Sequence, residues 1–306
     1  MIVVRTVAEL RRELQPARVA QKRIGFVPTM GAFHDGHLHL MRTADEECDL
    51  TVVSLFVNPT QFGDPADLEK YPRDDLRDTS LAESAGVDVL FAPSVKEMYP
   101  DGFNSAVELA GVTEALEGAT RGVGHFRGVA TVVLKLLNIV QPHVAYFGQK
   151  DAQQTVVVRQ LIRDFNLPVE TAVCPTVREH DGLAMSSRNI RLSGDARKKA
   201  VALSEALSLI EEQCASGERH TGTLLQNAGR HLAARGLAAD DIEYLAAVDS
   251  ISLKPVPAVE LAENHAPVLF AVAARVDGVR LIDNVLVPAA SAAHRIARFV
   301  RHGSPA

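Results

Sequence analysis

The chain has 306 residues, of which 47% are apolar and 23% charged, and it contains no tryptophan. This length exceeds the size at which one hydrophobic core usually stops growing, so we expect two domains, or one large α/β domain with an appendage. The net charge of −6 argues against a general nucleic-acid-binding surface, because such a surface needs a local excess of Lys and Arg.

The N-terminus and the cysteines bear on the cellular compartment. Charged residues appear too early for a secretory signal, and no apolar run approaches the roughly 18 residues that span a membrane. Cys48, Cys174 and Cys214 are odd in number and widely spaced, which fits neither a disulfide framework nor a zinc knuckle. We therefore expect a cytoplasmic protein that binds neither membrane nor nucleic acid.

The first half of the chain alternates short β-branched runs with helical patterns. The runs predict buried parallel strands near Ile24, Val53, Leu90, Tyr146 and Val173. The segments between them predict helices over residues 38–47, 75–84, 130–140 and 152–165. This alternation is typical of an α/β fold with a doubly wound, Rossmann-like parallel sheet.

The second half has a different residue pattern, with long alanine-rich segments that predict helices over 195–214 and 223–235. A strand follows at 242–249, and Asp277-Gly278 between two apolar alternating runs predicts a hairpin. We expect one domain over 1–187, a smaller α+β domain over 188–288 and a basic tail over 289–306. In the tail, Ile296, Phe299 and Val300 would share one face of an amphipathic helix, which is more often a cap than a membrane or partner contact.

Polar residues collect where the predicted strands end. Ligands of open parallel sheets bind outside the carboxyl ends of the strands, so the residues that follow each strand are candidates for a site. The residues concerned are Thr29, Met30, His34 and His37 after the first strand, Asn58, Thr60 and Gln61 after the second, Gly148 to Asp151 after the fourth, and Thr176, Val177 and Arg178 after the fifth. We expect these strand ends to meet in one crevice.

The stretch FVPTMGAFHDGH, Phe26 to His37, has the features of an anion site. Gly31 and Gly36 allow tight turns and a close backbone approach, and a helix that starts near His37 would present unpaired N–H groups. Such a helix terminus attracts phosphate, and imidazoles beside it can donate N–H bonds to phosphoryl oxygens. The same His-x-x-His spacing also fits two metal ligands on one helical turn, or two ordinary surface histidines.

Two further segments could complete a phosphate site. In FGQKDAQQ, Lys150 could neutralise phosphates, although a routine turn with the lysine in solvent fits equally well. In AMSSRN, the donors of Ser186, Ser187 and Arg188 could close over a triphosphate, although serine-rich loops are usually only linkers. The neutral amides of Asn58, Gln61 and Gln154 suit a ligand with hydroxyls and a carboxylate that must stay nucleophilic.

Taken together, these segments resemble the pantoate–β-alanine ligase (pantothenate synthetase) family of the HxGH nucleotidylyltransferase superfamily. The resemblance covers about residues 20–285. It is carried by PTMGAFHDGH, FVNPTQF, YPR, FAPSVKEMYPDG, GHFRGVATVV, FGQKDAQQ, PTVREHDGLAMSSRN and RLIDN. Within them, His34-x-x-His37 matches the HxGH element, and Met185 to Arg188 resembles the KMSKS-like loop.

The resemblance implies an ATP-dependent condensation of pantoate with β-alanine through a pantoyl adenylate, with release of AMP and pyrophosphate. It further implies a homodimer, Mg²⁺ with the triphosphate, and a smaller domain that closes over the active site. His37, as proton donor, His34 and Lys150 would be catalytic. ATP would be held by Met30, Gly31, His34, His37, Gly148, Gln149, Lys150, Asp151, Val177, Met185, Ser186, Ser187 and Arg188. Gln61, Gln154 and Asn58 would bind pantoate or β-alanine, and Asp78 would lie near the metal.

Three other functions stay open at this point: a nucleotide-binding regulator without chemistry, a related adenylate-forming ligase for a different acid, and a metal hydrolase that uses His34, Asp35 and His37. For the ligase we expect in-line positioning and charge stabilisation to do most of the catalytic work, without a protein nucleophile. A helix N-terminus disfavours an imidazolium, so we expect His37 to act as a neutral hydrogen-bond donor rather than to give up a proton.

Overall fold

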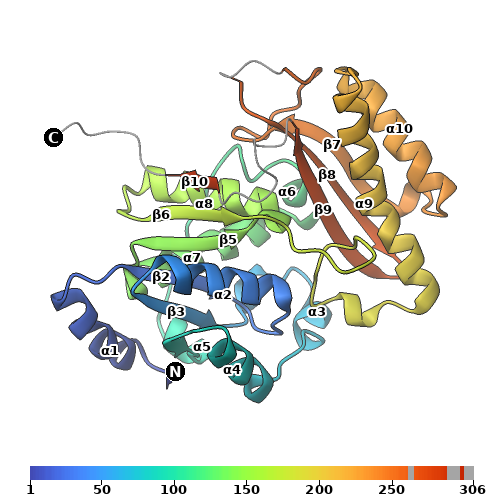
Figure 1. The fold of residues 1–306 in the computed structure, drawn as a ribbon. Coiled ribbons are helices and arrows are strands. Elements are labelled where there is room, and N and C mark those ends of the chain that lie inside the picture. Colours follow the sequence, from blue (N-terminus) through green and yellow to red (C-terminus); the bar gives the residue numbers. More distant parts are fainter. Residues whose placement is uncertain (261–264, 288–296, 300–306) are drawn as a thin grey trace.

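Two β-sheets organise the chain in the computed structural model, which describes residues 1–260, 265–287 and 297–299 (Figure 1). The larger sheet has the order β1-β4-β3-β2-β5-β6-β10, and the smaller has the order β7-β8-β9. All neighbours in the larger sheet pair in parallel except β10, which pairs antiparallel with β6. The predicted doubly wound parallel sheet and the additional α+β unit are therefore confirmed.

The strands of the larger sheet are β1 (Ile2–Val4), β2 (Ile24–Thr29), β3 (Leu50–Leu55), β4 (Val89–Phe91), β5 (Val144–Gly148), β6 (Glu170–Cys174) and β10 (Ala297–Phe299). Its α-helices are α1 (Val7–Val19), α2 (Asp35–Glu47), α3 (Pro65–Glu69), α4 (Asp75–Ser84), α5 (Val95–Met98), α6 (Glu117–Arg121), α7 (Val123–Val140) and α8 (Ala152–Asp164). Short 3₁₀ turns are η1 (Pro59–Gln61), η2 (Gln149–Asp151) and η3 (Asn189–Arg191).

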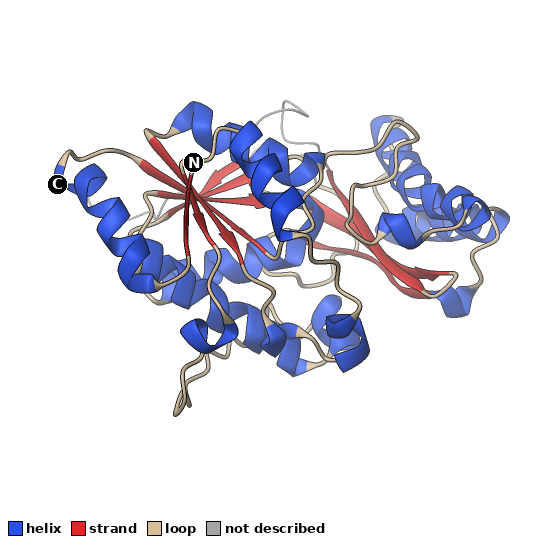
Figure 2. Ribbon diagram, turned by 90° about the horizontal axis from the view of Figure 1, so that it is seen from below, coloured by secondary structure: helices blue, strands red, loops and turns tan. Residues whose placement is uncertain are grey.

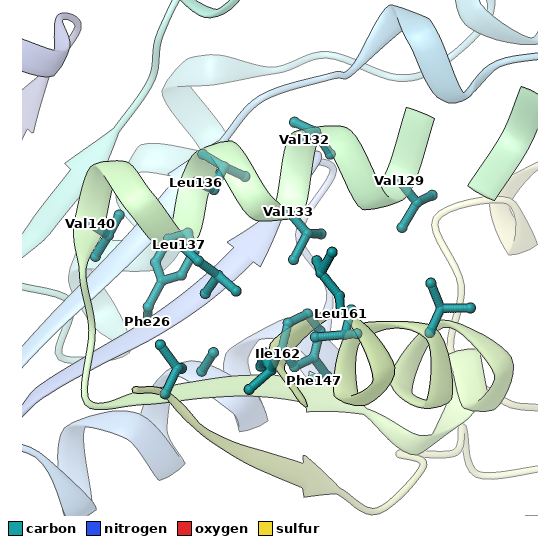
Figure 3. Packing of buried hydrophobic residues seen from close by; sticks show 14 of the residues in the cluster. Phe26, Val129, Val132, Val133, Leu136, Leu137, Val140, Phe147, Leu161 and Ile162 are labelled. Atoms are coloured by element: carbon teal, nitrogen blue, oxygen red, sulfur yellow. The ribbon is translucent and has the colours of Figure 1, made fainter. Parts of the chain in front are cut away.

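Side chains of each central strand alternate between two apolar layers, as the period of two in a strand requires. Phe26 of β2 belongs to the core beneath α7 and α8, whereas the next residue, Val27, packs with α2 on the other face. Figure 3 shows Val133 and Leu137 of α7 pointing toward Phe26 and the α8 helix. Burial on both faces explains why the strands read as continuous apolar runs.

The smaller sheet consists of β7 (Ile242–Asp249), β8 (Val268–Val276) and β9 (Val279–Val287), with α9 (Gly194–Ala215) and α10 (Thr221–Ala234) packed on one face. Figure 2 shows these helices on the far side of the small sheet from the large one. Asp277 and Gly278 both have positive φ, 47° and 80°, as a two-residue hairpin turn with Asp-Gly requires. The predicted hairpin is confirmed.

Two expectations about the elements are wrong. The helix expected from about His37 starts at Asp35 with His34 as its N-cap, and the His37 N–H donates to the His34 carbonyl, so this N–H is not unpaired. In the tail, Ala297–Phe299 form strand β10 rather than part of a helix, because they pair with the edge of β6. Ile296 and Val300 of the predicted amphipathic face lie outside the described residues.

Candidate active site

The sheet order reverses between β2 and β5, which lie side by side and from which the later strands run in opposite directions. A crevice at such a switch point is the expected ligand site of an open α/β sheet. A cavity of about 210 Å³ lies there. Its lining includes, of the predicted site residues, Met30, His34, His37, Asn58, Gln61, Gly148, Lys150, Asp151, Gln154, Val177, Met185, Ser186, Ser187 and Arg188.

His34 and Gly36 fix the local geometry of the HxGH segment. His34 has extended backbone, φ −139° and ψ 173°, and its Nδ1 accepts the Gly36 N–H at 3.2 Å, so the imidazole itself caps α2. A Cβ at Gly36 would lie 2.9 Å from His34 Cε1, which is too close for any side chain. The glycine is therefore needed to bring the imidazole over the helix terminus.

The two imidazoles lie against each other with ring centroids 4.2 Å apart. Burial lowers the pKa of His34 to about 4, and the nearby Lys150 charge adds to this effect. Burial also holds the pKa of His37 well below its ordinary value, with His34 and Lys150 as further causes. Both rings are consequently neutral near pH 7, although the cause is desolvation and neighbouring cations rather than the helix dipole alone.

His37 has one polar atom that has no partner within the described part of the protein. Its Nδ1 is buried and makes no hydrogen bond there. A buried, unpaired polar atom costs free energy unless a ligand or water satisfies it. His37 lines the cavity at the end of the helix, and its neutral ring carries one N–H group that suits an incoming oxygen atom.

Lys150 enters the cavity from η2, directly after β5. Its Nζ lies 4.0 Å from Asp151 Oδ1, and its side chain is 20% exposed. The ammonium is thus directed into the crevice rather than into open solvent. Gln149 does not line this cavity, because its Nε2 donates to Asn284 Oδ1 on β9 at 2.9 Å. Its predicted contact with the nucleotide through the side chain is not supported by this geometry.

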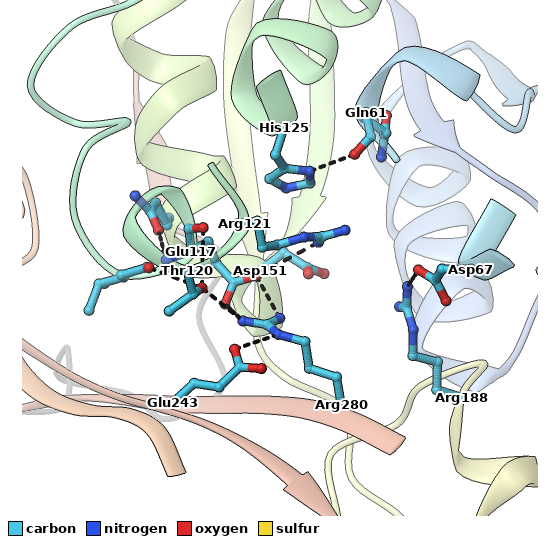
Figure 4. A network of polar contacts seen from close by, with 12 residues as sticks. Gln61, Asp67, Glu117, Thr120, Arg121, His125, Asp151, Arg188, Glu243 and Arg280 are labelled. Carbon is cyan, nitrogen blue, oxygen red and sulfur yellow. Dashed lines mark hydrogen bonds and ion pairs between the residues drawn. The ribbon is translucent and has the colours of Figure 1, made fainter. Parts of the chain in front are cut away.

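The Ser-Ser-Arg loop also reaches the cavity, and it is fastened to its neighbours. Ser186 Oγ accepts the Arg188 N–H at 3.2 Å. Arg188 donates to Asp67 of α3 at 3.0 Å (Figure 4). The guanidinium is therefore oriented by a carboxylate that faces it from the segment between β3 and α4.

The predicted substrate amides divide into two kinds. Asn58 is 1% exposed; its Nδ2 donates to Gln61 Oε1 and the Gly128 carbonyl, and its Oδ1 accepts bonds from Thr60 and Tyr99. With its hydrogen-bonding capacity used by the protein, Asn58 orients Gln61 rather than binds a substrate directly. Gln61 Nε2 lies 3.2 Å from Met30 Sδ, a weak acceptor that a substrate oxygen can replace.

Asp78 does not have the surroundings of a metal ligand. Its carboxylate is buried and accepts the N–H groups of Ala32 and Phe33 at 2.6 and 2.8 Å, so it holds the turn around Gly31. Gly31 has φ +84° and would place a Cβ 3.0 Å from Asp78 Oδ2, so it serves this turn and does not line the central cavity. The expectation that Asp78 lies near Mg²⁺ finds no support in this geometry.

An adjoining cavity of about 440 Å³ is lined by several residues that the sequence reasoning did not select. His125 Nδ1 lies 2.9 Å from the Gln61 carbonyl, and Arg121 lines the cavity beside them. Arg280 of β9 binds both carboxylate oxygens of Glu117, at 2.6 and 2.8 Å, and Glu243 at 2.8 Å (Figure 4). These residues follow no strand of the larger sheet, so the search at strand ends could not find them; a conserved His or Arg in an alignment would be the signal.

Comparison with known proteins gives a consistent result. The family model described as pantoate-beta-alanine ligase matches residues 2–286. Pantothenate synthetase 1 of Bradyrhizobium diazoefficiens is 52% identical over 94% of this chain and 98% of its own, and the pantothenate synthetase of Heliobacterium modesticaldum is 53% identical over 87% and 92%.

Two solved structures extend the likeness to the fold. Pantothenate synthetase from Thermus thermophilus has a TM-score of 0.85 at 46% identity, covering 93% of this chain and 99% of that one. The pantoate-beta-alanine ligase from Francisella tularensis, complexed with beta-gamma ATP and beta-alanine, has a TM-score of 0.76 at 34% identity, covering 95% and 100%. The chain belongs to the pantoate–β-alanine ligase family.

Proposed function

We propose that the crevice outside β2 and β5 is where this enzyme carries out both steps of its reaction. The enzyme is an AMP-forming ligase that condenses pantoate with β-alanine, with ATP as co-substrate and a pantoyl adenylate as intermediate. The observation that carries the proposal is that two imidazoles, one ammonium and the Ser-Ser-Arg loop line a single cavity.

In the first step, the pantoate carboxylate attacks the α-phosphorus of ATP and pyrophosphate leaves. The chain supplies positioning and positive potential, because a nucleophile is already present in the substrate. We assign His37 to the α-phosphate as a neutral N–H donor, with His34 beside it. Lys150 and Arg188 would neutralise the departing pyrophosphate, and the serine hydroxyls would donate to its oxygens.

In the second step, the free amine of β-alanine attacks the acyl carbon of the mixed anhydride and AMP leaves. Gln61 and Gln154 line both the central and the adjoining cavity, so they can hold the pantoyl group while β-alanine enters from the wider space. Water in this space would hydrolyse the anhydride. Closure of the Ser-Ser-Arg loop against α3 would exclude it.

Mg²⁺ accompanies the triphosphate in ligases of this kind and neutralises part of its charge. No group of three or more His, Cys, Asp or Glu side chains that could hold a metal occurs in residues 1–260, 265–287 and 297–299. Mg²⁺ does not need such a group, because it takes most of its ligands from phosphates and water and needs only one or two protein carboxylates. Asp151, half exposed at the rim of the cavity, is the carboxylate that we assign to it.

Exchange of labelled pyrophosphate into ATP tests the proposal. With pantoate and Mg²⁺ but without β-alanine, the enzyme should catalyse exchange, because adenylation is reversible and independent of the second substrate. A nucleotide-binding regulator would give no exchange. A ligase for a different acid would give exchange with that acid and not with pantoate, and loss of activity in magnesium buffer free of transition metals would favour a metal hydrolase.

We also make proposals about the oligomeric state, the cellular location and the domain boundary. We propose a homodimer, formed around β3 and the segment that follows it; sedimentation decides it. We propose a cytoplasmic location, which fits the finding that Cys48, Cys174 and Cys214 form no disulfide bond. We also propose that the chain divides near residue 187 into a nucleotide-binding unit and a closing unit; limited proteolysis would test that boundary.

No helix in the described part of the chain is long and apolar enough to cross a membrane.

A further inference from the structure

The segment RLIDN on β9 contains two buried polar residues whose side-chain hydrogen bonds go to partners outside the smaller sheet. Asp283 is 3% exposed and Asn284 is 5% exposed, although they lie in a strand whose other side chains are largely apolar. A buried polar side chain is costly unless its hydrogen bonds are satisfied. The partners of both residues lie in the nucleotide-binding unit.

Asn284 holds the turn that carries Lys150. Its Nδ2 donates to the carbonyls of Gln149 and Lys150, at 3.0 and 2.9 Å, and its Oδ1 accepts from Gln149 Nε2 at 2.9 Å. Two of these three hydrogen bonds hold two successive peptide carbonyls of η2, and the third holds the Gln149 side chain. Because Lys150 is one of these two residues, the start of its side chain is placed by a residue 134 positions later in the chain.

Asp283 holds the stem of the Ser-Ser-Arg loop in the same way. Its two oxygens accept bonds from both terminal nitrogens of Arg178, at 2.6 and 3.0 Å, and Arg178 also donates to the Gly182 carbonyl. Arg178 faces Ala184 across an isolated antiparallel bridge, and the Met185 N–H donates to the Val177 carbonyl. The bidentate ion pair therefore lies at the base of the loop that ends in Ser186 to Arg188.

We propose that Asp283 and Asn284 are positioning residues for adenylation, which set the Lys150 turn and the Ser-Ser-Arg loop in register with one another from a single strand of the smaller sheet. The two residues are adjacent on a hydrogen-bonded strand, so a displacement of β9 moves both nucleotide loops together. Both side chains line the adjoining cavity, but neither lines the one that holds His34 and His37, where we place adenylation. Their effect on the reaction passes through Lys150 and the loop, and this inference rests on the role proposed above for Lys150.

A double-mutant cycle between Asn284 and Lys150 tests the inference. Asn284→Ala should lower pantoate-dependent pyrophosphate exchange by about tenfold or more, the factor that about 1.4 kcal/mol of lost transition-state stabilisation produces. In the Lys150→Ala background the same substitution should lower exchange by less than about twofold, because the group that it positions is gone. An equal loss in both backgrounds would show a general structural effect and overturn the inference, as would the absence of any loss.

Controls separate this outcome from misfolding and from an error in the proposed function. Asn227→Ala is the matched control: Asn227 bonds Gln213 within the α9–α10 pair and should leave exchange unchanged. If Asn284→Ala fails to fold, the isosteric Asn284→Asp, which lacks the two donated bonds, replaces it in the cycle. Undiminished exchange in Lys150→Ala alone would refute the role of Lys150, a result distinct from additivity in the cycle.

Discussion

At the scale of single residues, His37 lines the central cavity and has a nitrogen with no partner among the described residues. We expect His37→Ala to slow adenylation by roughly a hundredfold or more, since loss of one preorganised donor to a developing charge costs about 3 kcal/mol. Pantoate-dependent pyrophosphate exchange measures this effect. His39→Ala, on the same helix α2, serves as the control; a His37→Ala rate near that of the unmodified enzyme would remove His37 from the mechanism.

The buried imidazoles also predict a pH dependence of stability. His34 and His125 have pKa values lowered to about 4, with burial as the main cause, and the pKa of His37 is lowered as well. An unfolded chain protonates these rings near pH 6.5, whereas in the folded chain His34 and His125 are protonated only near pH 4 and the pKa of His37 also lies well below its ordinary value. The unfolded state therefore binds more protons between these values, and stability that is present above about pH 6.5 is lost as the pH falls toward about 4.

Thermal melting across this pH range checks the prediction. The melting temperature should be insensitive to imidazole titration above about pH 7 and should fall between about pH 6.5 and 4. In His125→Gln the fall should be shallower, because one of the three groups no longer takes up a proton on unfolding. An equally steep fall in that variant would contradict the assignment.

At the scale of elements, the contact between the Ser-Ser-Arg loop and α3 pairs the Arg188 guanidinium with Asp67 and so affects how readily it binds a phosphate. Asp67 and a phosphate would compete for the same guanidinium, and the pair is partly exposed, so its strength is about 1 kcal/mol or less. Asp67→Asn should accordingly lower the KM for ATP by up to about fivefold. Steady-state kinetics checks this, with Asp277→Asn, which removes a remote surface pair with Lys199, as the control; a raised KM would show that Asp67 supports binding instead.

The five strands β2 to β6 and at least part of α2, α4, α7 and α8 could be predicted, because these strands are buried apolar runs with helical segments between them, whereas β1, α1, α3, α5 and α6 were not predicted. The segment 75–84 was predicted at its observed bounds, and 152–165 differs by one residue from α8. The start of α2 was missed because its N-cap is a histidine rather than the usual Ser, Thr, Asp or Asn. Strand β10 was missed because it forms by pairing with the edge strand β6, and a long-range contact of this kind leaves no pattern in the local sequence.

At the scale of the whole molecule, the contact between the smaller sheet and the larger unit includes a buried charge network. Burial raises the pKa of Glu117, but the hydrogen bonds and charge of Arg280 outweigh this effect and hold it below its ordinary value. Tyr244 donates a further bond to the same carboxylate at 2.7 Å. Glu117 is thus the common anchor of two strands of the smaller sheet.

Removal of this anchor should destabilise the protein. We expect Glu117→Ala to cost about 3 kcal/mol, because it leaves the Arg280 charge buried with only part of its compensation. The midpoint of urea unfolding measures this loss. Glu205→Ala removes a more exposed carboxylate, paired with Arg235 and His231, and should cost no more than about 1 kcal/mol; equal losses in the two variants would contradict a buried anchor.

The sequence predicts which residues of the site lie close together when those residues follow the ends of strands. Met30, His37, Lys150 and Arg188 meet because parallel strands share one carboxyl edge. Orientation was beyond that reasoning: Gln149 turns to β9, and Asn58 uses its hydrogen bonds within the protein. The orientations of these two side chains depend on hydrogen-bond partners in distant segments, Asn284 and Gly128. Only the folded structure shows that these partners lie nearby.

The central claim is that the rim above β2 and β5 binds the triphosphate of ATP. A crystal structure of the enzyme with pantoate and a non-hydrolysable ATP analogue tests it most directly. We predict phosphate oxygens within hydrogen-bonding distance of His37, Lys150 and the Ser-Ser-Arg loop, with the pantoate carboxylate facing the α-phosphorus beside Gln61 and Gln154. A triphosphate that lies elsewhere, or that leaves His37 and Lys150 without contact, would contradict the account.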